Sequence, residues 1–274
     1  MNISQVYAVY FSATGNTRKV TTTLANALAV SFDVPLEVRD FTLPAAREEA
    51  YEFAAGDLVV FGMPTYAGKL PNKLLDFVKS GFHGNGALAV PVVTFGNRSF
   101  DNSLAELCAC LEGDGFHTIG AGAFACRHAF TDALADGRPD SDDMAELARL
   151  GSAVVGRIVK MTQYPAPVTV DGDADAPYYR PLGLDGEPKV FLKAKPKTDP
   201  DKCIRCGVCA SLCPMGSINP DDVSEVTGVC IKCHSCVRNC PMGAKYFDDP
   251  AFLSHRAMLE RDYTRRAADK IFTA

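Results

Sequence analysis

The sequence predicts an α/β protein with a doubly wound parallel sheet of five strands, followed by a small α+β unit. Two observations predict this fold. Short apolar runs alternate with stretches of helical period in the first part of the chain, and eight of the eleven cysteines lie together between positions 203 and 240. A proline-rich stretch without helical period separates these two patterns. We therefore expect four parts, which cover residues 1–163, 164–198, 199–248 and 249–274, and the last of them reads as a helix.

Five apolar or alternating runs predict the strands of the sheet, at residues 6–11, 36–40, 57–62, 88–95 and 118–125. The stretches with helical period lie between and after them, at residues 18–31, 45–54, 72–79, 103–112 and 141–159. This alternation favours parallel strands joined by helices. Because the carboxyl ends of parallel strands meet at one edge, we expect the loops after the first, third and fourth strands to form one ligand site.

The first of these loops has the composition of an anion site. It reads Ser12-Ala13-Thr14-Gly15-Asn16-Thr17 and stands between a strand and a helix. Backbone N–H groups at the start of a helix point toward a bound anion, and hydroxyl and amide side chains add donors. The loop matches neither G-x4-G-K-[ST] nor G-x-G-x-x-G. The alternative is an ordinary helix capped by Ser or Thr.

The SATGNT stretch resembles the phosphate loop of the flavodoxins, [TS]-x-T-G-x-T. The resemblance implies FMN as a cofactor and the strand order 2-1-3-4-5. It also implies an aromatic wall after the third strand and backbone donors after the fourth. The corresponding positions are Pro64, Thr65, Tyr66, Ala67, Gly68, Gly96, Asn97, Arg98 and Phe100.

In this resemblance Tyr66 faces the isoalloxazine ring, Arg98 favours its reduced, anionic form, and Phe100 covers it. The alternatives are a tyrosine packed at the base of a loop and a solvated arginine. Cys126 and His128 follow the fifth strand near the same edge. For these two, a buried inert thiol and a structural histidine are the commoner roles.

The cysteine-rich stretch is a duplicated motif. Each half has the spacing C-x2-C-x2-C-x3-C followed by Pro-Met-Gly, and the halves are 27 positions apart. Three thiolates separated by two residues each can wrap three corners of a cuboidal cluster. Zinc usually takes paired C-x2-4-C units, which leaves the third C-x2-C unexplained, and disulfides need an oxidising compartment. The spacing therefore favours iron–sulfur clusters.

The motif resembles that of the two-cluster bacterial ferredoxins, in which the fourth cysteine of each run ligates the other cluster. The resemblance implies two [4Fe–4S] clusters in a small α+β ferredoxin domain. One cluster would take Cys203, Cys206, Cys209 and Cys240, and the other Cys213, Cys230, Cys233 and Cys236.

Composition narrows the setting. Hydrophobic content of 47% and charged content of 22% are typical of a soluble globular protein. A net charge of −5 without long charged runs does not favour a nucleic acid or an anionic membrane as partner. No apolar run approaches the roughly 18 residues of a membrane-spanning helix. With no signal-like start and many thiols, we expect a cytoplasmic protein.

The whole chain resembles the flavodoxin–ferredoxin fusion proteins of anaerobic bacteria and archaea, through FSATGNT, GMPTYAGKLP, FGNRSFDN and the cysteine run. The resemblance implies an electron-transfer iron–sulfur flavoprotein that relays single electrons between FMN and a redox protein or a small-molecule donor or acceptor. The alternative is an FMN-dependent oxidoreductase that reduces a small organic substrate, with His128 and Tyr66 as candidates for proton transfer. If flavin and clusters are far apart, a homodimer could bring one chain's cluster to the other's flavin.

Overall fold

The computed structural model describes residues 2–273. Residues 1 and 274, which belong to the predicted first and last parts of the chain, lie outside the described residues. Its centre is a parallel sheet of β1 (Gln5–Tyr10), β2 (Leu36–Asp40), β4 (Asp57–Pro64), β6 (Leu88–Phe95) and β8 (Ala121–Ala125). These strands lie in the order β2-β1-β4-β6-β8, so the predicted order 2-1-3-4-5 is confirmed. In the register, Val60 of β4 lies opposite Ala8 of β1 and Val90 of β6.

Two strands extend the predicted five. The short β7 (His117–Thr118) pairs with β6, and β11 (Lys270–Phe272) pairs antiparallel with β8 at the edge of the sheet. The prediction of a helix over 249–274 is therefore wrong beyond its first half, since α7 (Pro250–Asp262) ends before this strand. The physical reason is that β8 would otherwise leave an open edge, whose N–H and C=O groups the tail satisfies.

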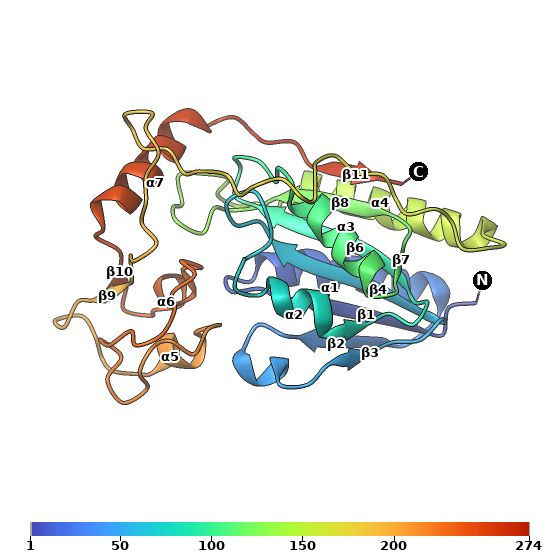
Figure 1. The fold of residues 1–274 in the computed structure, drawn as a ribbon, viewed down its shortest axis with the longest axis horizontal. Coiled ribbons are helices and arrows are strands. Elements are labelled where there is room, and N and C mark those ends of the chain that lie inside the picture. The colour runs from blue at the N-terminus through green and yellow to red at the C-terminus, as the bar shows by residue number, and fades with distance from the viewer. Residues whose placement is uncertain (1, 274) are drawn as a thin grey trace.

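Helices cover both faces of the sheet (Figure 1). On one face, α1 (Asn16–Phe32) and α4 (Ser141–Lys160) bury one apolar cluster, and on the other, α2 (Leu75–Ser80) and α3 (Ser103–Gly113) bury a second. The start of α4 is well defined, because the Asp140 carboxylate accepts from the N–H groups of Asp142 and Asp143 in a capping box. The doubly wound arrangement is thus confirmed.

The helix predicted over 45–54 is absent. A 3-10 turn, η1 (Pro44–Arg47), precedes the short strand β3 (Tyr51–Glu52), which pairs with β5 (Phe82–His83). The Tyr51 ring stacks on Phe82 with centroids 5.2 Å apart, inside a group of phenylalanine rings. Aromatic packing therefore outweighs the helical propensity of this segment.

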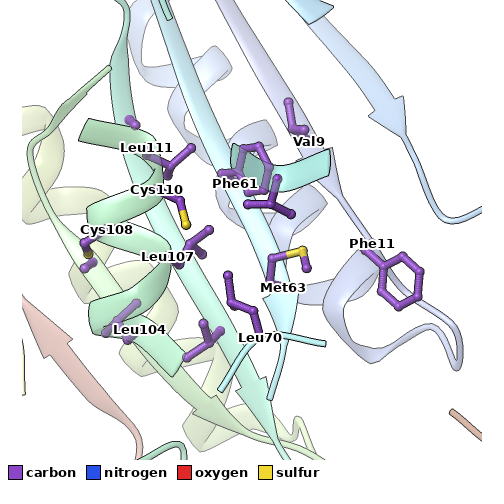
Figure 2. Close-up of a cluster of buried hydrophobic side chains, with 14 of the residues drawn as sticks. Val9, Phe11, Phe61, Met63, Leu70, Leu104, Leu107, Cys108, Cys110 and Leu111 are labelled. Carbon is purple, nitrogen blue, oxygen red and sulfur yellow. The ribbon is translucent and has the colours of Figure 1, made fainter. Parts of the chain in front are cut away.

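Figure 2 shows part of the core between α3 and the sheet, where Phe61, Met63, Leu104 and Leu107 are buried. Cys108 and Cys110 lie in the same cluster and point to different sides of α3, as their spacing of two predicts. Burial raises the pKa of Cys110 to about 11, so this thiol is protonated and inert.

The proline-rich connector runs over the surface of the sheet domain and is fixed there. Tyr179 N–H donates to Ala67 O over 2.8 Å, and the Tyr178 hydroxyl donates to Leu70 O over 2.9 Å. Lys69 Nζ donates to the carbonyl oxygens of Ala174 and Ala176 over 2.8 and 2.9 Å. The connector is therefore part of the packed structure rather than a free hinge.

The cysteine-rich unit contains β9 (Lys197–Thr198), α5 (Val208–Ser211), α6 (Ser235–Arg238) and β10 (Lys245–Tyr246), and α7 follows it. It lies at the end of the molecule that faces the carboxyl edge of the sheet (Figure 1). Among residues 2–273, no helix is long and apolar enough to cross a membrane.

Candidate functional site

The loop after β1 leads directly into α1. Gly15, which precedes α1, has φ +91°, a conformation that favours glycine, and it has no side chain to cap the helix. Ser12 instead orders the loop, because its Oγ accepts from Arg18 N–H over 3.0 Å and its own N–H donates to Thr42 Oγ1 over 2.8 Å. A long helix that begins without a cap can hold a phosphate group at its N-terminus.

Two side chains of this loop have protein partners. Thr17 Oγ1 lies 2.7 Å from Thr94 Oγ1 of β6. Asn16 Nδ2 donates to Arg127 O over 3.0 Å, which ties the loop after β1 to the loop after β8. Asn16 therefore shapes the site in this structure through the backbone of Arg127.

The loop after β4 is a tight turn. The N–H of Tyr66 donates to Lys69 O over 2.8 Å, and Ala67 and Gly68 have φ of 49° and 79°. A Cβ on Gly68 would lie 2.4 Å from the Asp101 carboxylate. The half-buried Tyr66 has a pKa well above its usual value, first because of burial and then because of the nearby thiolates of Cys233 and Cys230.

The loop after β6 approaches the loop after β8. A Cβ on Gly96 would lie 2.3 Å from His128 Cδ2, so only glycine lets the imidazole pack here. The Arg98 guanidinium lies 3.9 Å from the centre of the Tyr179 ring and pairs with Asp101. Arg98 is therefore a fixed charge, and the alternative of a solvated arginine is wrong.

These loops surround one large cavity of about 230 Å3. Most of the residues predicted to contact FMN line it. They are Ala13, Thr14, Asn16, Thr17, Pro64, Thr65, Tyr66, Ala67, Gly68, Gly96 and Arg98.

The other four predicted residues do not line the cavity. Ser12 and Gly15 fix the conformation of the first loop through hydrogen bonds of Ser12 and the positive φ of Gly15. Phe100 packs on Phe95 in the core, with ring centres 5.7 Å apart, and therefore does not cover the cavity. Asn97 is turned to the C-terminal tail, where its Nδ2 donates to Tyr263 O and Arg265 O over 2.6 and 2.7 Å.

Cys126 and His128, which the sequence places near this edge of the sheet, also line the cavity. Further lining residues were not predicted. They come from the loop after β8, the connector, the cysteine-rich unit and α7, and include Phe130, Tyr179, Phe191, Ile231, Lys232 and His255. Those outside the loop after β8 carry no local signal, since only the packing of the second unit brings them here.

His128 is neutral in this environment. Burial, and after it the nearby His255, Arg238 and Arg98, lower its pKa to about 3. Its Nδ1 accepts from Phe130 N–H over 3.1 Å, which leaves the proton on Nε2. His128 can therefore donate a hydrogen bond, but its low pKa makes it a poor proton acceptor at neutral pH.

The eight motif cysteines line two separate smaller cavities. The first cage is lined by Cys203, Cys206, Cys209 and Cys240. The second cage is lined by Cys213, Cys230, Cys233 and Cys236. This grouping is the one that crossed ligation requires, and it supports that set of ligands, which stays a prediction.

Backbone donors face thiols in both cages. Ser217 N–H donates to Cys213 Sγ over 3.3 Å, and Ala244 N–H donates to Cys240 Sγ over 3.2 Å. Such bonds stabilise negative charge on sulfur. Within residues 2–273, no three His, Cys, Asp or Glu side chains are close enough together to bind a single metal ion.

One residue lines both the second cage and the large cavity. Ile231 lines both, and the neighbouring Lys232 also lines the large cavity. The first cage shares no lining residue with the large cavity. Figure 1 shows the cysteine-rich unit beside the same edge of the sheet. The second cage therefore borders the predicted flavin site within one chain.

Comparisons with known proteins agree with both parts. A family model described as a flavodoxin domain matches residues 7–94, and two models described as 4Fe-4S binding domains match residues 196–219 and 227–243. The chain therefore combines a part that is similar to flavodoxin domains with two parts that are similar to 4Fe-4S binding domains. This combination supports an iron–sulfur flavoprotein that transfers electrons.

Solved structures with a similar sheet domain include an archaeal flavodoxin, 18% identical, covering 57% of this chain and 99% of that one at a TM-score of 0.39. The flavodoxin of Streptococcus pneumoniae TIGR4 is 16% identical, covering 56% and 99% at 0.41. Rubredoxin oxygen:oxidoreductase from the anaerobe Desulfovibrio gigas is 14% identical, covering 58% and 37% at 0.39. No curated protein matches the chain.

Proposed function

We propose that the chain holds FMN in the large cavity and one [4Fe–4S] cluster in each cage, and that it transfers electrons between FMN and an external redox partner. The observation that carries this proposal is the shared wall, since Ile231 lines both the large cavity and the second cage. A flavin and a cluster on either side of one side chain are close enough for direct electron exchange.

The residues around the large cavity suit FMN. The uncapped start of α1 offers N–H donors and a positive dipole end to the phosphate. Tyr66 supplies an aromatic wall, and Arg98 supplies a charge fixed by Asp101 and Tyr179. FMN supplies two-electron chemistry that can be divided into single electrons, and the surrounding side chains exclude water from it.

The two cages suit clusters, because each offers four thiols around a cavity and a backbone donor to one of them. All eleven cysteines are free. The proposal therefore includes a reducing compartment, the cytoplasm, in which these thiols stay available for iron.

The test is composition together with redox behaviour of protein purified without oxygen. We expect about eight irons, about eight sulfides and one FMN per chain. A reductive titration followed by absorption and EPR should show cluster signals and flavin bleaching in the same chain. Iron without flavin would refute the FMN site, and zinc in place of iron would refute the clusters.

A further inference from the structure

The two halves of the cysteine-rich unit repeat in structure as well as in sequence. Arg205 and Lys232, 27 positions apart, have φ of 54° and 55°. Gly216 and Gly243 have φ of 58° and 59°. The helices α5 and α6 start at equivalent positions. The motif residues around the second cage, such as Cys213, Met215, Cys230 and Ile231, therefore have counterparts around the first.

The second cage faces the sheet domain. Met215 and Ile231 pack against the main apolar cluster of the sheet domain. Arg47 Nη2 donates to Pro214 O over 2.5 Å at the same contact. This inner face, made by Met215 and Ile231, seals the second cage and closes the large cavity.

The first cage faces outward. Ile204 and Met242 are the counterparts of Ile231 and Met215, and they are 61% and 47% exposed. Both line the first cage. Cys206 is the exposed cysteine of that cage. Two large apolar side chains beside a cluster cavity are costly to leave in water.

We propose that this outer face, made by Ile204 and Met242, is the docking site for an external redox protein, which makes there the same kind of contact that the inner face makes with the flavin site. The inference rests on the proposed function. Small electron-transfer complexes bury limited, transient surfaces, which suits two apolar anchors. A second copy of this chain does not fit, because its own inner face already closes its flavin site.

The electron balance is simple, and no bond forms or breaks. The docked protein loses one electron and is oxidised, and the first cage's cluster gains that electron. The second cage's cluster then gains it as the first is reoxidised. Electrons thus enter the chain at the outer face, and the inner face is where they pass between the second cage and the flavin site.

The test uses the holoprotein purified without oxygen, with iron and FMN content measured first. Ile204→Glu and Met242→Glu are compared with Val190→Glu, because Val190 is 77% exposed and belongs to neither face. The probe is a reduced two-[4Fe–4S] ferredoxin, and stopped-flow absorption gives the second-order rate constant of cluster reduction. A small donor, the methyl viologen radical, serves as a second probe that needs no docking.

We expect both outer-face variants to slow reduction by ferredoxin about tenfold more than they slow reduction by the viologen radical, as for interface anchors. Val190→Glu should change neither rate. Equal ferredoxin rates in all variants would overturn the proposal, as would a wild-type protein that ferredoxin does not reduce. A parallel loss with viologen would trace the effect to the first cage itself and contradict docking. Missing iron or FMN in the wild type would instead refute the proposed function.

Discussion

Gly96 and His128 both line the large cavity, and they pack closely against each other. Because a Cβ on Gly96 would lie 2.3 Å from the imidazole, Gly96→Ala should displace His128 into the cavity. We expect FMN affinity to fall by about tenfold, the loss that 1.4 kcal/mol produces. Fluorescence titration of flavin-free protein measures it.

Gly156 offers a matched control for that substitution. It lies in α4, and a Cβ there meets nothing within 4 Å. Gly156→Ala should leave FMN binding unchanged and stabilise the protein by about 0.5–1 kcal/mol, because alanine is the better helix former. If both variants lose FMN equally, the close contact between Gly96 and His128 is not the cause.

His128 also predicts a dependence of stability on pH. Its pKa is about 3 in the folded chain and near 6.5 when unfolded. Between these values the unfolded chain binds one more proton, so stability falls as the pH drops below about 6.5. His128→Gln should reduce this loss. The melting temperatures of both proteins, measured from pH 5 to pH 8, should differ most in acid, and a constant difference would contradict the assignment.

At the scale of elements, buried polar groups fasten segments that are distant in sequence. Asn97 is 2% exposed, and its amide bonds to the tail at Tyr263, Arg265 and Ala267. This contact fixes the segment between α7 and β11. The loop after β6 therefore holds the tail as well as the cavity.

Asn97→Gly isolates this role, because glycine accepts the φ of 68° and removes only the amide. Each unpaired buried group costs about 1–3 kcal/mol. We expect amide hydrogen exchange in Lys270–Phe272 to become at least tenfold faster, while the amides of β1 keep their protection. Unchanged exchange in the tail would show that β11 holds without this loop.

Lys69 and Glu106 form a buried ion pair that fastens the connector. Their atoms lie 3.0 Å apart, and Lys69 also donates to two connector carbonyls. Lys69→Met should cost about 3–5 kcal/mol of unfolding free energy, because Glu106 is left buried without its partner. Urea unfolding measures the loss. The double variant Lys69→Met with Glu106→Gln should recover part of it, and no recovery would mean that the connector contacts matter more than the pair.

At the scale of the whole molecule, Arg238 joins the cysteine-rich unit to the sheet domain. Its Nε donates to Ala129 O over 2.9 Å, its Nη2 donates to His128 O over 2.8 Å, and its Nη1 pairs with Asp132 at 2.5 Å. These carbonyls belong to the loop after β8 that lines the large cavity. Arg238 thus couples the position of the second cage to the shape of the flavin site.

Arg238→Gln should therefore weaken FMN binding by about tenfold while iron content stays unchanged. The control is Arg149→Gln, which breaks a solvent-exposed pair with Glu146 on α4, where such pairs contribute little. Fluorescence titration and iron analysis of both variants decide the matter. Equal FMN affinity in both would show that the two units sit together without this arginine.

The local patterns of the sequence were sufficient for the alternation of strands and helices and for the position of the loop before α1, because both depend on periodicity and composition within a few residues. The strand order and the division of the cysteines into two groups came from the resemblance to known families. Only the tertiary structure determined where Phe100, Asn97 and the C-terminal tail lie, because each is packed against segments that are distant in sequence.

It also decided the most informative feature, the position of Ile231 between the second cage and the large cavity. The sequences C-I-R-C and C-I-K-C look equivalent when they are read along the chain. Only docking of one repeat on the sheet domain makes Ile231 an internal wall and leaves Ile204 in solvent, since packing between units has no signature in local sequence.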